Sequence, residues 1–237
     1  MKTLSGKNVL IVGGSRGIGA ALVERFAREG SAVTFSYATA TDAAEALAAK
    51  TGAVAICSDA ADRSALVALV ARCGPLDVLV FNAGLAVYGD PLTLDADAVD
   101  RMIAINVNAP YHAAVEAART MPDGGRIVVI GSTNAERMPF AGAAAYALTK
   151  SAVQGLAKGL ARDFGVRNIT VNVVQPGPTD TDMNPADGPM APAMHEFMAL
   201  KRHGSAADVA SLVAYLAGPD AAGITGASHT IDGGFAA

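Results

Sequence analysis

Residues 9–30 read VLIVGGSRGIGAALVERFAREG, in which an apolar run passes through a glycine-rich loop into a segment of helical period. Gly13, Gly17 and Gly19 lie in that loop. Glycines let the backbone turn tightly and approach a pyrophosphate, whose charge is met by the N–H groups that open the next helix. The spacing, Gly-x-x-x-Gly-x-Gly, differs from the usual Gly-x-Gly-x-x-Gly. The stretch predicts a strand, a loop and a helix that together bind a dinucleotide.

The same alternation continues along the chain. Short apolar, β-branched runs alternate with longer Ala-rich segments, which predicts a parallel sheet covered by helices on both faces. The expected strands are Asn8–Val12, Ala32–Ser36, Ala53–Cys57, Leu76–Phe81, Arg126–Gly131, Ile169–Val174 and Ala227–Ile231. The expected helices are Gly17–Glu29, Thr41–Lys50, Asp62–Arg72, Asp95–Thr120, Ala145–Phe164 and Ala206–Ala217. We expect one doubly wound α/β domain over residues 1–237, with about seven parallel strands.

Residues 184–200, NPADGPMAPAMHEFMAL, break this rhythm. They follow a strand, and ligands of an open α/β sheet bind outside the carboxyl ends of the strands. Pro and Gly interrupt a regular helix here, so we expect a mobile substrate lid. The alternative is an ordinary packed helix whose methionines face the core. In the lid interpretation, an adaptable apolar lining is formed by Met183, Met190, Met194 and Met198.

The composition excludes several classes of protein. The chain has a net charge of −4 and no basic run, which argues against binding to a nucleic-acid polymer. No apolar run reaches the ~20 residues that span a bilayer, so no membrane insertion is expected. The first residues enter a strand without room for a signal peptide, and Cys57 and Cys73 lack metal-ligand spacing. We expect a cytoplasmic protein with two buried free thiols and no metal site.

Tyr146 and Lys150 stand four residues apart in AAAYALTKS, with Ser132 upstream. Positions i and i+4 share one face of a helix. A nearby ammonium favours the phenolate, so we expect Lys150 to lower the pKa of Tyr146 toward neutrality and create a poised proton donor. A serine hydroxyl at a strand end would hold the carbonyl oxygen that receives the proton. Tyr and Lys at this spacing also occur by chance in helices that only pack.

Several motifs, in this order, resemble those of the short-chain dehydrogenase/reductase family: the glycine loop, Asn82-Ala83-Gly84, Asn106, Ser132, Tyr146-x-x-x-Lys150 and Pro176-Gly177. The resemblance covers nearly the whole chain and implies a Rossmann fold. Two positions depart from the common pattern. Val12 stands where many members have Thr, whose hydroxyl would tie the glycine loop to the Asn-Ala-Gly turn, and Phe81 stands where a second Asn is common.

The resemblance implies a role for each catalytic residue. Tyr146 gives the proton in reduction and takes it in oxidation, Lys150 lowers the pKa of Tyr146 and binds the nicotinamide ribose, and Ser132 holds the substrate oxygen. Asn106 would hold a water in a proton relay. Pro110 lies four residues beyond Asn106 and removes the helical hydrogen bond to its carbonyl, so we expect a kink there.

The same resemblance assigns the cofactor contacts. Asp59 would contact the adenine, residues 82–84 would line the adenine ribose, and Thr179 with Thr181 would hold the nicotinamide carboxamide. The full expected set is Gly13, Ser15, Arg16, Gly17, Ile18, Gly19, Ser36, Tyr37, Asp59, Asn82, Ala83, Gly84, Tyr146, Lys150, Pro176, Gly177, Thr179 and Thr181.

The cofactor preference follows from charge. NAD-binding proteins of this kind place a carboxylate at the end of the second strand, where it accepts from the ribose hydroxyls. Residues 35–39, FSYAT, contain no carboxylate that would repel a 2′-phosphate. Arg16 could pair with that phosphate, and Ser36 and Thr39 could add hydroxyl donors. We therefore expect NADP(H) to be favoured over NAD(H), although Arg16 could also be only a solvated loop cation.

The loops beside these motifs are apolar and contain one cation, Arg137. They predict a hydrophobic ketone or secondary alcohol as substrate, and hence an NADPH-dependent carbonyl reductase. The expected substrate walls are Leu85, Val87, Met138, Phe140, Met183 and Met194.

A second interpretation comes from a closer resemblance. GGSRGIGAA, RMPFAGAAAYA and NVVQPGPTDTDMNPADGPM are similar to a subgroup described as cyclic-di-GMP-binding biofilm-dispersal mediators. A protein of that kind would sequester cyclic-di-GMP in the cofactor cleft, with little or no catalysis. The glycine loop and helix N-terminus would receive either kind of phosphate.

Assembly is also inferred from the resemblance, which implies a homotetramer whose contacts include the C-terminal strand. The helix over residues 145–164 carries a stripe of small residues, Ala147, Ser151, Gly155 and Gly159. Such a stripe suits close packing against a partner helix, or against the protein's own sheet.

Overall fold

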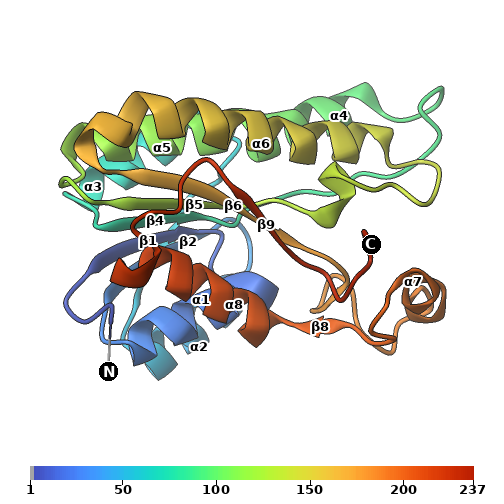
Figure 1. The fold of residues 1–237 in the computed structure, drawn as a ribbon, viewed down its shortest axis with the longest axis horizontal. Helices are drawn as coiled ribbons and strands as arrows, with labels where there is room; N and C mark the ends of the chain where they lie inside the picture. Colours follow the sequence, from blue (N-terminus) through green and yellow to red (C-terminus); the bar gives the residue numbers. More distant parts are fainter. Residues whose placement is uncertain (1–2) are drawn as a thin grey trace.

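The computed structural model describes residues 3–237. Seven parallel strands form one sheet in the order β3-β2-β1-β4-β5-β6-β9 (Figure 1). The strands are β1 (Asn8–Val12), β2 (Ala32–Tyr37), β3 (Val54–Cys57), β4 (Val78–Phe81), β5 (Arg126–Ile130), β6 (Thr170–Pro176) and β9 (Ser228–Ile231). The predicted Rossmann fold is confirmed, because both the strands and their parallel pairing agree with the expectation.

Helices cover both faces of this sheet (Figure 1). They are α1 (Gly17–Arg28), α2 (Thr41–Thr51), α3 (Arg63–Arg72), α4 (Ala96–Ile103), α5 (Ala109–Thr120), α6 (Ala144–Phe164), α7 (Ala191–Phe197) and α8 (Ala206–Ala217). α3, α5 and α6 pack on one face, and α1, α2 and α8 pack on the other. Leu10 and Val12 of β1 face the first layer, whereas Val9 and Ile11 face the second. A central parallel strand is apolar throughout because each of its faces lies against a helical layer.

The strand order reverses beside β1, which pairs with β2 on one side and with β4 on the other. Val12 and Phe81 are register partners at the carboxyl ends of β1 and β4. The glycine loop and the Asn82–Gly84 turn therefore leave the sheet next to each other. A crevice at such a switch point is the usual ligand site of an open α/β sheet.

The helix expected over residues 95–120 is divided into three parts. α4 ends at Ile103, residues Ala104–Asn108 form a π-helical turn, and α5 begins at Ala109. Pro110 has no N–H for the carbonyl of Asn106, and its ring crowds that carbonyl. The wider turn accommodates this conflict, and it lies at the position where the kink was predicted.

The segment around the expected lid contains two strands that were not predicted. β7 (Thr179–Asp180) and β8 (Gly204–Ser205) pair with each other, and α7 lies between them in the sequence (Figure 1). Met183 and Met194 line the cleft as expected. Met190 is exposed and Met198 is buried, so the prediction is wrong for these two. Met198 follows α7 in extended backbone, and its methyl group lies close to Gly233.

The prediction that both cysteines are buried is also wrong. Both are free, but Cys57 is exposed and Cys73 is half-buried. Cys57 ends β3, which is the outermost strand of the sheet and pairs on one side only. Burial raises the pKa of the Cys73 thiol.

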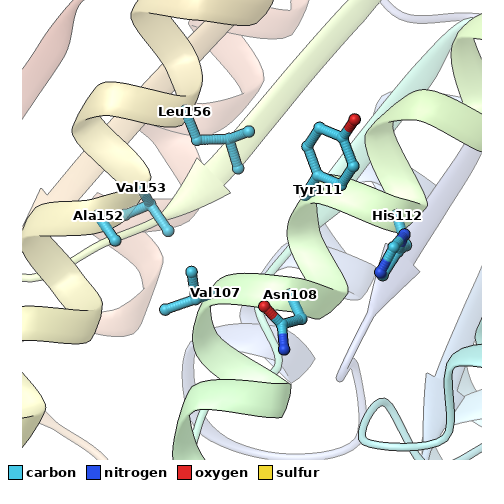
Figure 2. A pocket seen from close by; sticks show the side chains of 7 residues that line it. All are labelled: Val107, Asn108, Tyr111, His112, Ala152, Val153 and Leu156. Carbon is cyan, nitrogen blue, oxygen red and sulfur yellow. The ribbon is translucent and has the colours of Figure 1, made fainter.

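The outer surface of α5 and α6 carries the small-residue stripe. Ser151, Gly155 and Gly159 are exposed, and a Cβ added at either glycine would meet nothing within 4 Å. The stripe therefore does not pack against the protein's own sheet. Beside it, a hollow of about 340 Å³ lies between the two helices (Figure 2). Its lining is Val107, Asn108, Tyr111, His112, Ala152, Val153 and Leu156.

Among residues 3–237, none of the helices combines the length and the apolarity needed to cross a bilayer.

Candidate active site

A cleft of about 800 Å³ opens at the carboxyl ends of the strands, at the switch point. The predicted site residues that line it are Gly13, Ser15, Arg16, Gly17, Ile18, Ser36, Tyr37, Asp59, Asn82, Ala83, Gly84, Ser132, Tyr146, Lys150, Pro176, Gly177, Thr179 and Thr181. Gly19 and Asn106 lie behind the lining. A Cβ at Gly19 would be 2.1 Å from the carbonyl oxygen of Gly13, so glycine is needed where α1 meets the loop.

The glycine loop is fastened to the Asn82–Gly84 turn without a threonine at position 12. The Asn82 side chain donates from Nδ2 to the carbonyl of Gly13 at 2.6 Å. The backbone N–H groups of Asn82 and Ala83 both donate to the carbonyl of Val12. Gly13 has φ +81°, and a Cβ there would lie 2.7 Å from Ala83. Asn82 thus makes the connection that the Val12 departure removes.

The end of β2 is suited to an anionic group. Residues Ala38–Ala40 line the cleft, and α2 begins at Thr41 with no side-chain cap on its first N–H groups. Arg16 is exposed at the cleft and makes no salt bridge within residues 3–237. A free guanidinium and uncapped amides both favour a phosphate.

Ser36 has a further role that its sequence position did not reveal. Its side chain is buried, and its Oγ accepts from the N–H of Gly13 at 3.1 Å. The carbonyl of Ser36 also accepts from the N–H of Gly14 at 2.8 Å. β2 therefore holds the first turn of the glycine loop.

Asp59 lies at the far end of the cleft and forms an ion pair with Arg101, which sequence reasoning missed. Arg101 Nη2 and Asp59 Oδ2 are 2.7 Å apart. Burial raises the pKa of Asp59, but hydrogen bonds from Arg101 and from the N–H of Ala61 outweigh burial and lower it overall. Arg101 belongs to α4, more than 40 residues away in the sequence, so no local motif could reveal the pair.

Tyr146, Ser132 and Lys150 come together at the middle of the cleft. The Lys150 Nζ lies 5.8 Å from the centroid of the Tyr146 ring and donates to the carbonyl of Ile130 at 3.1 Å. Removal of the phenol from water raises the pKa of Tyr146, the nearby Tyr88 adds to the rise, and a hydrogen bond with Ser132 opposes it. Burial lowers the pKa of Lys150 to about 8.

The expectation that Lys150 lowers the pKa of Tyr146 is therefore not met in this structure. The ammonium lies over the ring and bonds a backbone carbonyl, and burial of the phenol is the larger effect. Tyr146 is a protonated phenol at neutral pH, which is the form that a proton donor requires.

Asn106 is buried, with 2% of its surface exposed. Its Oδ1 accepts from the N–H of Leu85 at 2.9 Å, and its Nδ2 donates to the carbonyl of Leu85 at 2.8 Å and to Thr149 Oγ1 at 3.0 Å. The side chain thus holds the loop that follows β4 against α6.

The residues expected at the nicotinamide end lie on the loop that follows β6. A Cβ at Gly177 would be 2.5 Å from Asp232, so the loop packs closely on the C-terminal segment. Thr179 is buried, and its Oγ1 donates to the carbonyl of Gly177 at 2.9 Å. Thr181 Oγ1 accepts from the N–H of Asn184 at 3.3 Å. These bonds order the chain between β6 and α7.

Most of the remaining wall of the cleft is apolar, and Thr133, Asn134, Asp182 and Asn184 are its polar members near the loop after β6 and the end of β5. Of the expected substrate residues, Leu85, Phe140, Met183 and Met194 line it, whereas Val87 and Met138 do not. Tyr88, the residue after Val87, lines the cleft although it was not predicted.

Two further aromatic residues complete this wall. The ring of Tyr88 is 5.5 Å from that of Tyr146, centroid to centroid. Phe235, near the C-terminus, is buried and stacks edge-on against Phe197 of α7. Arg137 is turned away from substrate chemistry, since its guanidinium donates to the carbonyls of Phe235 and Ala237.

The donor set fits a phosphorylated nicotinamide dinucleotide. The glycine loop brings backbone N–H groups to the cleft, Arg16 adds a free cation, and the end of β2 presents no carboxylate. Within residues 3–237 no cluster of three His, Cys, Asp or Glu side chains has the arrangement of a metal site.

Comparison with known proteins agrees with this fit. The family described as Enoyl-(Acyl carrier protein) reductase matches residues 12–236. An Escherichia coli (strain K12) protein described as a cyclic-di-GMP-binding biofilm dispersal mediator is 60% identical over 237 residues, which is 100% of both chains. The crystal structure of BdcA in complex with NADPH is 61% identical, with a TM-score of 0.97 over 98% of this chain and 96% of that one.

A short chain dehydrogenase from Burkholderia cenocepacia J2315 in complex with NADP is 46% identical, with a TM-score of 0.97 over 99% of this chain and 100% of that one. The NADPH and NADP held by these two solved structures bear out the preference for NADP(H) that was predicted from charge. Fold, motifs and similarity together place this chain in the short-chain dehydrogenase/reductase family of oxidoreductases.

Proposed function

We propose that this protein is an NADPH-dependent carbonyl reductase that acts on hydrophobic ketones and, in reverse, on secondary alcohols. The observation that carries the proposal is the meeting of Tyr146, Ser132 and Lys150 in a cleft whose lining is mostly apolar. Apolar walls favour an uncharged substrate, and hydroxyl donors are the groups that polarise a carbonyl oxygen.

The proposed chemistry assigns one task to each residue. Ser132 and Tyr146 donate hydrogen bonds to the carbonyl oxygen of the substrate. NADPH, when bound, supplies the hydride that adds to the carbonyl carbon. Tyr146 gives its phenolic proton to the oxygen, which becomes the alcohol hydroxyl. Lys150 is charged below about pH 8 and stabilises the phenolate that remains.

The cofactor-binding role is proposed for the lining residues of the glycine loop, the end of β2 and the loop after β6. Asn106 is proposed to complete the catalytic group through its backbone carbonyl, while its side chain holds Leu85.

We also propose that residues 1–237 act as one catalytic domain with a lid at about 184–200. Four copies of the chain are proposed to assemble, and the protein is proposed to work in the cytoplasm.

The test is oxidation of NADPH and NADH against a panel of aryl and cyclic ketones. We expect turnover with NADPH, and a loss of about 100-fold or more in Tyr146→Phe, because a general acid contributes roughly 10²–10⁴-fold. Tyr215→Phe, an exposed tyrosine on α8 outside the cleft, is the control and should keep full activity. Turnover that survives in Tyr146→Phe would contradict the assigned proton donor.

A second candidate function is sequestration of cyclic-di-GMP. It is favoured by the 60% identity to the Escherichia coli protein that is described as binding this dinucleotide. Calorimetric titration with cyclic-di-GMP, with and without saturating NADPH, distinguishes the candidates. If cyclic-di-GMP binds tightly, NADPH abolishes that binding and no ketone is turned over, sequestration replaces reduction as the proposed function.

A further inference from the structure

Thr149 lies between Tyr146 and Lys150 and is fully buried, with 0% of its surface exposed. Its Oγ1 donates to the carbonyl of Tyr146 at 2.8 Å and accepts from Asn106 Nδ2 at 3.0 Å. A threonine that bonds a carbonyl three residues back is common in helices. The bond from Asn106, which stands 43 residues away, is the unusual feature.

The bond to Thr149 completes a continuous network. The side-chain amide of Asn106 makes three hydrogen bonds. Its oxygen accepts from the N–H of Leu85, and its Nδ2 donates to the carbonyl of Leu85 and to Thr149 Oγ1. The network therefore runs from Leu85 in the cleft wall, through the π-helical turn, to the backbone of Tyr146. Buried networks of this kind constrain orientation because each unpaired group would carry a desolvation cost.

The position of Gly84 shows how close this network is to the reacting groups. A Cβ at Gly84 would lie 3.5 Å from Lys150 Nζ and 3.6 Å from Asn106 Oδ1. The loop after β4, the π-helical turn and α6 thus converge on one point. A rotation of α6 about its axis would move Tyr146 and Lys150 relative to Leu85, and Thr149 is the side chain of α6 that bonds Asn106.

We propose that Thr149 is a positioning residue that sets the register of Tyr146 against the Asn106–Leu85 wall. Its hydroxyl acts through these neighbours and does not touch substrate. The kinetic consequence rests on the proposed reductase function, whereas the positioning itself is a property of the fold.

The test compares Thr149→Val, which removes the hydroxyl and keeps the shape, with Thr149→Ser, which keeps the hydroxyl. We expect Thr149→Val to lower kcat by about 10- to 100-fold, since small misplacements of catalytic groups have effects of that size. The KM for NADPH should change less than about twofold, and Thr149→Ser should restore kcat to within about threefold of the wild type.

A second measurement does not depend on activity. Hydrogen exchange at the Leu85 amide, which donates to Asn106 Oδ1, should accelerate about tenfold or more in Thr149→Val. The amide of Val128 in β5 is the control and should not change. If the wild-type protein shows no turnover, only the reductase proposal is refuted. Hydrogen exchange at the Leu85 amide would then still test the positioning role of Thr149. Unchanged exchange at Leu85, or equal acceleration at Leu85 and Val128, would overturn the positioning role.

Discussion

Asn82 performs a task that a threonine hydroxyl at position 12 would perform in other members of the family. Its amide reaches the Gly13 carbonyl, and the backbone of the same turn bonds Val12. Ser36 supports the loop from the other side, through Gly13 and Gly14. At the residue scale, the glycine loop is therefore held by hydrogen bonds from two strand ends, without a hydroxyl at position 12.

Arg16 should decide the choice between the two nicotinamide cofactors. It is exposed at the cleft and has no acidic partner within the described residues 3–237, so it is free to pair with a 2′-phosphate. Charge-assisted hydrogen bonds contribute about 1.5–3 kcal/mol, which corresponds to roughly 10- to 100-fold. We expect Arg16→Ala to raise the KM for NADPH by at least about tenfold and to leave the KM for NADH nearly unchanged.

The matched control is Arg28→Ala at the end of α1, which lies outside the cleft. Both Michaelis constants should be unaffected in that variant. If Arg16→Ala raised the KM for NADPH and the KM for NADH equally, Arg16 would not bind the 2′-phosphate.

Lys150 should limit activity at alkaline pH. Burial lowers its pKa to about 8, so the ammonium is present below that pH and is lost above it. Reduction needs the charge to stabilise the phenolate, and kcat/KM for NADPH reports groups of the free protein. We expect kcat/KM to fall above about pH 8. In Lys150→Arg, whose cation does not titrate, activity should be lower but independent of pH between 7 and 9. The same alkaline fall in both proteins would assign it to another group.

At the element scale, the α7 segment is held by a pair of histidines. His195 Nε2 and His203 Nδ1 lie 2.7 Å apart and join α7 to the start of β8. His203 is buried, and its Nε2 has no partner within residues 3–237. This contact was not predicted from the sequence, because the two residues share no metal or catalytic spacing. The contact therefore ties this short helix to the chain that follows it.

Acidification should loosen this segment. Burial, and then the neighbouring His195, lowers the pKa of His203 below its ordinary 6.5, while Asp180 opposes the shift. A histidine with a lowered native pKa contributes stability that is complete above pH 6.5 and is lost as the pH falls through 6.5 toward the native value. We expect Tm to fall more between pH 7.5 and 5.5 in the wild type than in His203→Gln, which cannot titrate. An identical pH response in the wild type and His203→Gln would rule out the histidine pair.

At the scale of the whole molecule, the sheet brings distant segments together in the cleft. The C-terminal residues return to it, with Asp232 accepting from Thr133 and from the N–H groups of Gly234 and Ala236. On the outer surface of α5 and α6, Gly155 and Gly159 are exposed beside the hollow, whose lining residues Figure 2 shows. We expect this surface to bind a second copy of the chain.

Gly155→Arg tests the assembly. Nothing surrounds Gly155 within 4 Å, and replacing a helical glycine does not weaken the helix, so the fold should be kept. We expect light scattering to give about four times the chain mass of 23.8 kDa for the wild type and a smaller assembly for the variant. Ala46→Arg, exposed on α2, is the control for added charge. A variant that keeps the wild-type mass would exclude this surface from the interface.

The sequence by itself determined the sheet, because strands buried on both faces are continuously apolar and the segments between them have the apolar periodicity of helices. All of the predicted cofactor and catalytic residues except Gly19 and Asn106 also line the cleft, since the glycines and the Tyr-x-x-x-Lys spacing act through local geometry. The tertiary structure alone decided the raised pKa of Tyr146, the Asp59–Arg101 pair and the Asn106–Thr149 bond. It also decided which methionines face the cleft. These features depend on burial and on contacts between residues far apart in the chain, and neither quantity is encoded in the spacing of one segment.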